Sequence, residues 1–171
     1  MVQEGNLTLM QNFKINLKKE TFNFAAAHLI TYGAKTCEKL HGHNYRVSVM
    51  LTGELDPENG YVYDFVFIKP IIKKIVDKLD HCVLLAQYNK FLKIKEEKGQ
   101  IKLFYKSKEY FFPRSDVVLL PIENTTVELL AQYINPQLYQ ELQVSKHGQI
   151  TVLEIEVEES FGQSASFRKE Y

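Results

Sequence analysis

Residues 41 to 51 (HGHNYRVSVML) alternate between two kinds of position, and this alternation constrains the fold more than any other feature of the chain. The positions of one parity are His41, His43, Tyr45, Val47, Val49 and Leu51. An earlier segment repeats the pattern through Phe22, Phe24, Ala26 and His28. Successive side chains of a strand point to opposite faces, so each segment predicts a β-strand with one buried face.

Two later segments have helical spacing. Between Asp64 and Asp80 one stripe carries Phe65, Ile68, Ile72, Ile75, Val76 and Leu79. Pro70 resists an interior position, so this helix is expected to start near residue 67 or to bend there. Residues 125–128 (TTVE) match a capping box and open a second helix, which Pro136 is expected to disturb.

The remaining segments complete an α+β pattern. Residues 100–112 predict a hairpin that turns near Lys106 to Lys108, and residues 149–160 predict a last strand. That strand has Glu154, Glu156 and Glu158 on one side, and Leu153, Ile155, Val157 and Glu159 on the other. The order indicates a mostly antiparallel sheet with helices on one face and a solvated charged face. One domain spanning residues 1–171 is expected.

Composition excludes several function classes. The chain has 21 basic and 21 acidic residues, so charge gives no case for nucleic acid or an anionic membrane as a partner. No apolar run reaches the ~20 residues that a membrane span needs. The N-terminus lacks a secretory pattern, and Cys37 and Cys82 cannot form a disulfide framework. A cytoplasmic protein with a small-molecule partner is expected.

Three histidines suggest a metal site. His28 ends the first strand on its buried parity, and His41 and His43 open the second strand. If the two strands pair, the three imidazoles meet on one face and leave one vacant position on a tetrahedral zinc ion, as in catalytic zinc sites. An isolated HxH motif is weak evidence for a metal site. The alternative is that the three are unrelated core or surface histidines.

Five other side chains are candidates for chemistry. The Cys37 thiol acts as a base or nucleophile only if its pKa is lowered or a partner accepts its proton. Asp80 and His81 could assist it, or could be an ordinary pair at a helix end. Glu38 is either a second acid–base group or a solvated loop charge. Glu159 is either solvated at a strand end or held to bind a donor-rich heterocycle.

Six motifs occur in order between about residues 20 and 160: FNFAAAH, CEKLHGHNY, GYVYDF, LDH, NTTVELLA and EVEES. Together they resemble the family of 6-pyruvoyl-tetrahydropterin and 6-carboxy-tetrahydropterin synthases. The string C-x-x-x-H-G-H with a later D-H is much more specific than any single motif. The resemblance implies the tunnelling fold (T-fold), a four-stranded antiparallel sheet with two helices on one face, here with an extra hairpin. It also implies trimers that close a barrel and stack into a homohexamer.

The resemblance implies 7,8-dihydroneopterin triphosphate as the substrate. By resemblance, the zinc ligands would be His28, His41 and His43. Cys37 would be the general base, with support from Asp80 and His81. Glu159 would anchor the pterin ring, and Thr125 and Thr126 would lie near it. The first interpretation is a zinc-dependent lyase that forms 6-pyruvoyl-5,6,7,8-tetrahydropterin and releases triphosphate. Lys35, Lys39 and Arg168 are weak candidates for the triphosphate, since solvated surface charge explains them equally well.

Two features depart from the pattern. Glu38 directly follows Cys37, whereas family members in malaria parasites have the glutamate, lack the cysteine and cleave the side chain of the same substrate to 6-hydroxymethyl-7,8-dihydropterin for folate synthesis. This chain keeps both residues, so Glu38-dependent cleavage is the alternative, and a non-catalytic pterin- or metal-binding member is a further one. Residues 88–120 are longer than in compact bacterial carboxy-forming enzymes, and EYFFPRSDVVLLPI is similar to the parasite-type members.

Overall fold

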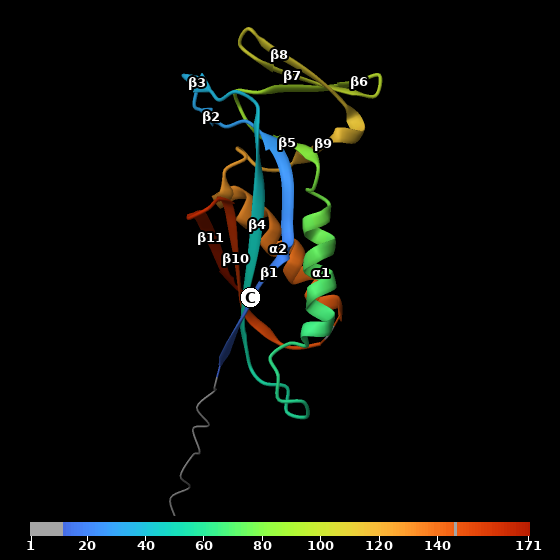
Figure 1. Ribbon diagram of the computed structural model, residues 1–171, viewed down its shortest axis with the longest axis vertical. Coiled ribbons are helices and arrows are strands. Elements are labelled where there is room, and N and C mark those ends of the chain that lie inside the picture. Colours follow the sequence, from blue (N-terminus) through green and yellow to red (C-terminus); the bar gives the residue numbers. More distant parts are fainter. Residues whose placement is uncertain (1–11, 146) are drawn as a thin grey trace, which may run out of the picture.

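A mixed β-sheet forms the centre of the computed structural model, which describes residues 12–145 and 147–171. Its strand order is β11-β10-β4-β1-β5-β9 (Figure 1). The strands are β1 (Phe13–His28), β4 (His41–Gly53), β5 (Cys82–Ala86), β9 (Val117–Leu120), β10 (Ile150–Ser160) and β11 (Gln163–Glu170). The first eleven residues of the expected domain, on which the judgement about a secretory signal depended, lie outside the described residues.

The expected antiparallel sheet is confirmed in its four strands β11, β10, β4 and β1. Strand β11 was not predicted, because its sequence, QSASFRKE, has few apolar residues and much of the strand is exposed. The short strands β5 and β9 extend the sheet and pair parallel, β5 to β1 and β9 to β5. The sheet is therefore wider than the predicted one and mixed at one side.

The pairing of β1 with β4 decides which side chains share a face. Phe24 lies opposite Tyr45, Ala26 opposite His43, and His28 opposite His41. Residues directly opposite each other in an antiparallel pair point to the same side of the sheet. The apolar parity of both strands and all three histidines therefore lie on one side.

Two α-helices cover that side, α1 (Phe65–Asp77) and α2 (Val127–Ser145) (Figure 1). Helix α1 begins at Phe65, slightly before the start expected near residue 67, because Asp64 caps it by accepting a hydrogen bond from the Val66 N–H at 2.7 Å. Pro70 and Pro136 both lie inside uninterrupted helices. Each proline is exposed, and so is the residue four places earlier, where the carbonyl loses its helical partner. Water can solvate that carbonyl, which explains why neither helix breaks.

A second, smaller sheet lies beyond the end of β1 and the start of β4 (Figure 1). It contains β6 (Lys93–Glu97), β7 (Gln100–Tyr105) and β8 (Lys108–Pro113) in that order. The hairpin expected over residues 100–112 is confirmed as β7 and β8, and β6 adds a third strand that was not predicted. A separate apolar cluster attaches this sheet to the main one; its core consists of Leu29, Leu85, Ile101, Leu103 and Val117. A 3₁₀ turn, Arg114–Asp116, then leads into β9.

The other side of the main sheet is charged. Two ion pairs there reach from β1 across β4 to β10: Lys14 to Glu154 at 3.7 Å and Lys18 to Glu156 at 3.3 Å. A third joins the adjacent strands β4 and β10, Arg46 to Glu158 at 3.3 Å. The charged face predicted for the last strand is therefore confirmed. No helix in the described part of the chain is both long and apolar enough to cross a membrane.

Candidate active site

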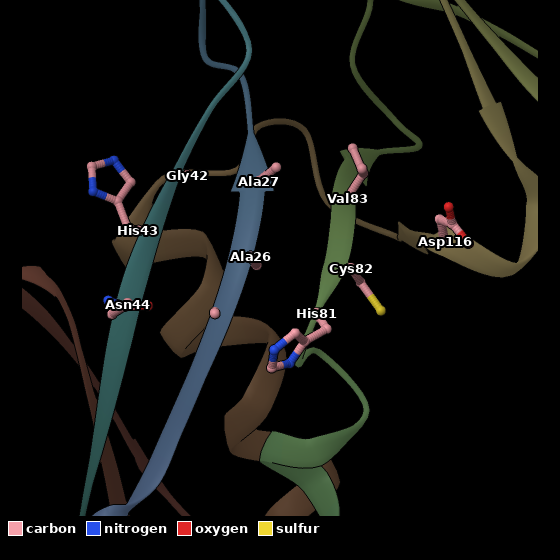
Figure 2. Close-up of a pocket in the computed structure, with 10 residues that line it drawn as sticks. Ala26, Ala27, Gly42, His43, Asn44, His81, Cys82, Val83 and Asp116 are labelled. Carbon is pink, nitrogen blue, oxygen red and sulfur yellow. The ribbon is translucent and has the colours of Figure 1, made fainter.

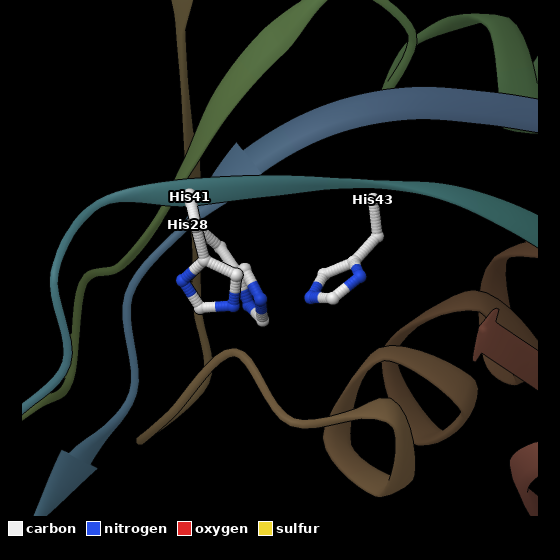
Figure 3. Close-up of side chains that lie close together, drawn as sticks. All are labelled: His28, His41 and His43. Carbon is white, nitrogen blue, oxygen red and sulfur yellow. The ribbon is translucent and has the colours of Figure 1, made fainter.

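Three histidines converge where β1 ends and β4 begins. One candidate ligand atom from each of His28, His41 and His43 lies within 4.8 Å of the others. Figure 3 shows the three rings on the same side of β4, the side on which α2 lies. Gly42 permits the close approach of the strands, because a Cβ there would lie 3.2 Å from the Ala26 carbonyl oxygen. The alternation of the sequence therefore does bring the three imidazoles together within one chain.

Backbone carbonyls orient two of the rings. His28 Nδ1 donates to the Thr125 carbonyl oxygen at 2.9 Å, and His41 Nδ1 donates to the Lys39 carbonyl oxygen at 2.9 Å. A carbonyl only accepts, so the proton sits on Nδ1 and the Nε2 lone pair is free in each ring. Burial lowers the pKa of His28 to about 4, so its ring is neutral at neutral pH.

The histidine cluster fits a metal ion. His28 is fully buried, and its Nε2 has no hydrogen-bond partner among the described residues. Leaving such an atom unsatisfied costs about 1–3 kcal/mol, a cost that a bound cation would remove. Neutral imidazoles whose other nitrogen donates to a carbonyl are typical metal ligands. With zinc–nitrogen bonds of ~2.1 Å, ligand atoms lie about 3.4 Å apart, so small side-chain rotations would close the site.

Glu38 lies beside this cluster. One of its carboxylate oxygens is 3.8 Å from His41 Nε2. The other accepts a hydrogen bond from the Tyr32 hydroxyl at 2.5 Å, and this bond raises the pKa of Tyr32. The oxygen nearer His41 is buried and has no hydrogen-bond partner among the described residues. A carboxylate oxygen with free acceptor capacity is thus held next to the candidate metal site.

Cys37 points elsewhere. It ends the two-residue strand β3 (Thr36–Cys37), which pairs with β2 (Thr31–Tyr32). Its side chain packs against the second apolar cluster, the one around Leu103. Burial raises the pKa of the Cys37 thiol, although the charge of Lys108 opposes the shift. The two neighbouring candidates for a base therefore lie in different environments, and the structure brings Glu38, rather than Cys37, to the histidines.

Asp80 and His81 form the contact that their adjacency suggested. His81 Nδ1 lies 2.9 Å from one Asp80 oxygen, while the other oxygen accepts the Ala25 N–H at 2.8 Å. This N–H bond is the main reason that the pKa of Asp80 is lowered. His81 has φ of +56° and is highly exposed.

This Asp80–His81 pair faces away from the three histidines of the same chain. Ala26 and His43 contribute to the lining of a groove of about 470 Å³, which His81 lines together with Ala25, Ala27, Gly42 and Asn44 (Figure 2). These strand residues have the parity opposite to that of Ala26 and His43, so the groove opens on the sheet face that carries no helix. Within one chain the Asp80–His81 pair therefore does not join the histidine cluster, which consists of His28, His41 and His43.

A family model described as 6-pyruvoyl tetrahydropterin synthase matches residues 16–170. The chain belongs to the 6-pyruvoyl tetrahydropterin synthase family. A protein of Methanocaldococcus jannaschii, provisionally named a 6-carboxy-5,6,7,8-tetrahydropterin synthase, is 37% identical over 146 residues, which are 85% of this chain and 89% of its own.

Two solved members of the synthase family come from malaria parasites. The 6-pyruvoyl tetrahydropterin synthase of Plasmodium falciparum is 38% identical, with a TM-score of 0.87. That of Plasmodium vivax is 32% identical, with a TM-score of 0.88, in a variant that replaces a catalytic glutamate by alanine. Each comparison covers 94% of this chain and 99% of the other. The α+β tunnelling fold is confirmed, and the protein is an enzyme of this pterin synthase family.

In this synthase-family chain, Thr125 contacts the histidine cluster through His28. It is 1% exposed, and its hydroxyl donates to the Leu29 carbonyl at 3.0 Å while its own carbonyl holds His28. That hydroxyl lies turned toward Leu29 and His28, and α2 begins at Val127. Thr126 accepts the Leu130 N–H in the first turn of α2. Thr125 is thus placed to orient the His28 ring, a role that the sequence did not indicate.

Glu159 and two tyrosines complete the surroundings. Glu159 lies at a bulge near the end of β10, and its charge adds to the effect of burial in raising the pKa of Tyr45. The Tyr45 ring lies 5.9 Å from the His28 ring and 5.7 Å from the His43 ring, and its hydroxyl has no partner among the described residues. Sequence reasoning gave neither Tyr45 nor Tyr32 a role. For Tyr45 the signal was available, because it shares the parity of His41 and His43.

The proposed triphosphate cations differ in their surroundings. Lys35 and Lys39 are exposed on the segment that carries Glu38. Arg168 lies on β11, opposite Glu154, and pairs with Glu170 at 2.8 Å. The two lysines therefore lie near Glu38 along the chain, whereas Arg168 already has an acidic partner.

Proposed function

We propose that this protein is a zinc-dependent lyase that cleaves the side chain of 7,8-dihydroneopterin triphosphate to give 6-hydroxymethyl-7,8-dihydropterin, with Glu38 as the acid–base residue. One observation carries the choice: the Glu38 carboxylate faces the histidine cluster, while the Cys37 thiol packs into an apolar cluster. The family and the metal-ligand geometry support the broader assignment. The catalytic glutamate of the Plasmodium vivax relative supports the choice of Glu38 as the acid–base residue.

His28, His41 and His43 would hold the zinc ion, Zn²⁺. When bound, it would polarise a side-chain oxygen of the substrate and so favour loss of the attached proton. Glu38 takes the proton from the hydroxyl on the second side-chain carbon. The bond between the first and second side-chain carbons then breaks, and its electron pair passes into the dihydropterin ring. Protonated Glu38 returns the proton to the first carbon, leaving 6-hydroxymethyl-7,8-dihydropterin and a triphosphorylated aldehyde.

The other residues have supporting roles in this proposal. Tyr32 holds the Glu38 carboxylate through its hydroxyl. Glu159 would accept hydrogen bonds from the amino and ring N–H groups of the pterin, because an ionised carboxylate offers two acceptor oxygens. Thr126 would lie near the ring, and the buried Thr125 would act through His28. We place the reaction in the cytoplasm.

A homohexamer of two stacked trimers is part of the proposal. Asp80 and His81 lie on the sheet face opposite the histidine cluster, so they can complete an active site only if that site belongs to a neighbouring copy. The exposed strand β11 at one side of the main sheet gives such a neighbour an edge to pair with. Light scattering should give the mass of six chains, and a monomer with full activity would contradict this part.

Formation of 6-pyruvoyl-5,6,7,8-tetrahydropterin, with Cys37 as the base, is the second candidate. The intact Asp80–His81 contact favours it, because the family pattern assigns that pair to the support of the cysteine. It requires the Cys37 side chain to leave its apolar surroundings and turn toward the histidines. The geometry therefore supports it less well than the Glu38 reaction.

Product identification tests the proposal directly. Zinc-loaded wild-type protein and the Cys37→Ser variant would each be incubated with 7,8-dihydroneopterin triphosphate, and the products analysed by mass spectrometry. We expect 6-hydroxymethyl-7,8-dihydropterin from both, with rates within about three-fold of each other, since the half-buried thiol, which packs against the apolar cluster, takes no part. A 6-pyruvoyl product that disappears in Cys37→Ser would establish the second candidate instead. Substrate that binds and stays unchanged would contradict both.

A further inference from the structure

The segment that carries Glu38 has little internal support. Between β1 and β4, strands β2 and β3 pair over only two residue pairs, Thr31 with Cys37 and Tyr32 with Thr36. Residues 32–36 are all exposed. A short ladder of this kind is marginal alone, and beyond it the Glu38 N–H donates to the Ile30 carbonyl oxygen at 2.9 Å, so the position of Glu38 also depends on contacts from elsewhere in the chain.

The small sheet supplies those contacts through two lysines. Lys108, the first residue of β8, donates from Nζ to the carbonyl oxygen of Cys37 at 3.1 Å and to that of Glu38 at 3.3 Å. Lys106, in the turn before it, donates to the Lys35 carbonyl at 2.8 Å. Among the described residues Lys108 has no ion pair, whereas Lys102 on the adjacent strand pairs with Glu97 at 2.7 Å. The ammonium group of Lys108 is therefore directed at the backbone of residues 37 and 38.

The contact falls where the backbone changes direction between Cys37 and Glu38. Successive residues of an extended strand present their groups to opposite sides, so one ammonium that reaches two successive carbonyls indicates a change of direction there. The ladder of β3 indeed ends at Cys37. Apolar packing from the same small sheet acts on the neighbouring side chains, because Cys37 and Leu40 pack against the cluster that contains Ile101 and Leu103.

We propose that Lys108 is a positioning residue that holds Glu38 toward the histidine cluster and, together with the apolar surface of the small sheet, keeps Cys37 away from it. The proposal rests on the proposed function in one respect, namely that Glu38 is the acid–base residue. It gives the segment of residues 88–120 a role in the choice between the two side chains.

Three variants test the role of Lys108. Lys108→Met keeps an unbranched stem and removes the charge, Lys108→Arg keeps the charge, and Lys102→Met breaks an ion pair elsewhere on the same sheet. Each would be assayed as the zinc-loaded protein with 7,8-dihydroneopterin triphosphate for kcat, KM and product. We expect Lys108→Met to lower kcat by about 10- to 100-fold with KM within about three-fold, because a displaced catalytic group loses rate more than binding. Lys108→Arg should restore at least half of the lost rate, and Lys102→Met should match wild type.

A second readout does not depend on turnover. In a Cys82→Ser background, and at a pH that fully ionises the thiol in both proteins so that the lost Lys108 charge has no effect, Lys108→Met should make Cys37 react with iodoacetamide at least about five-fold faster, because the thiol becomes more accessible. Normal kcat and normal Cys37 reactivity in Lys108→Met would overturn the proposal. So would a loss of rate that Lys108→Arg does not restore, which would indicate a structural role only.

Glu38→Gln in the same assay separates this proposal from the proposed function. If Glu38→Gln is inactive while Lys108→Met behaves as wild type, only the positioning role of Lys108 fails. If Glu38→Gln retains full activity, the proposed function fails, and the positioning role fails with it.

Discussion

Replacing Glu38 by glutamine is expected to lower kcat by about 1,000-fold, with zinc content unchanged and KM altered by less than about five-fold. General acid–base catalysis typically contributes 10²–10⁴-fold, and an amide cannot accept the proton that the carboxylate takes. The glutamine retains the length of the side chain and a carbonyl oxygen that can still accept the Tyr32 hydrogen bond. Steady-state kinetics with product detection by liquid chromatography would measure the effect.

A glutamate remote from the histidines gives the matched control for this substitution. Glu58 is exposed in the turn that follows β4, and Glu58→Gln removes the same charge without touching the site. It should remain within about two-fold of wild type. If Glu38→Gln kept more than a tenth of the wild-type rate while Cys37→Ser lost it, the assignment of the base would be reversed.

Replacing His28 by alanine is expected to weaken zinc binding by more than about 100-fold and to abolish measurable turnover. Loss of an outer-shell partner alone typically costs 10–100-fold in metal affinity, and His28 would be a direct ligand. Zinc content after dialysis against a chelator, measured by atomic emission, reports the change. His147 provides the matched control, because its ring stacks on Phe67 of α1 rather than joining the cluster.

Because His28 is fully buried, its replacement can also disturb folding. His43→Ala removes a second candidate ligand that is only half-buried, so it separates loss of metal from loss of structure. Circular dichroism should show both variants folded. Zinc retained with wild-type stoichiometry in a folded His43→Ala protein would contradict the proposed ligand set.

The histidine cluster could be predicted from the sequence because strand geometry alone determines it. Once residues 22–28 and 41–51 alternate, an antiparallel pairing places His28 opposite His41 and leaves His43 on the same face. The surroundings of Cys37 and Glu38 could not be predicted in this way. They depend on Lys108, which lies 71 residues from Cys37 in the chain, and on an apolar cluster built from several segments.

The Asp80–His81 pair shows the same division between local and distant causes. Adjacent residues at the end of a helix can meet without any tertiary information, and they do. The face of the sheet on which the pair lies follows from the parallel pairing of β5 with β1, which the sequence analysis did not include. Strand β11 and strand β6 were missed for a related reason: neither has the apolar alternation that indicates a buried strand face.

The short β2–β3 ladder has a consequence for how such enzymes diverge. Its two residue pairs enclose a turn over residues 33–35. The length of this turn determines which residues of β3 pair with β2. A strand displaced by one residue exchanges the sides of all its side chains. We expect an inserted or deleted residue that displaces β3 by one position to move the Cys37 side chain to the other side of the ladder. We therefore expect the length of this loop, as well as Lys108, to affect which of the two side chains faces the histidines.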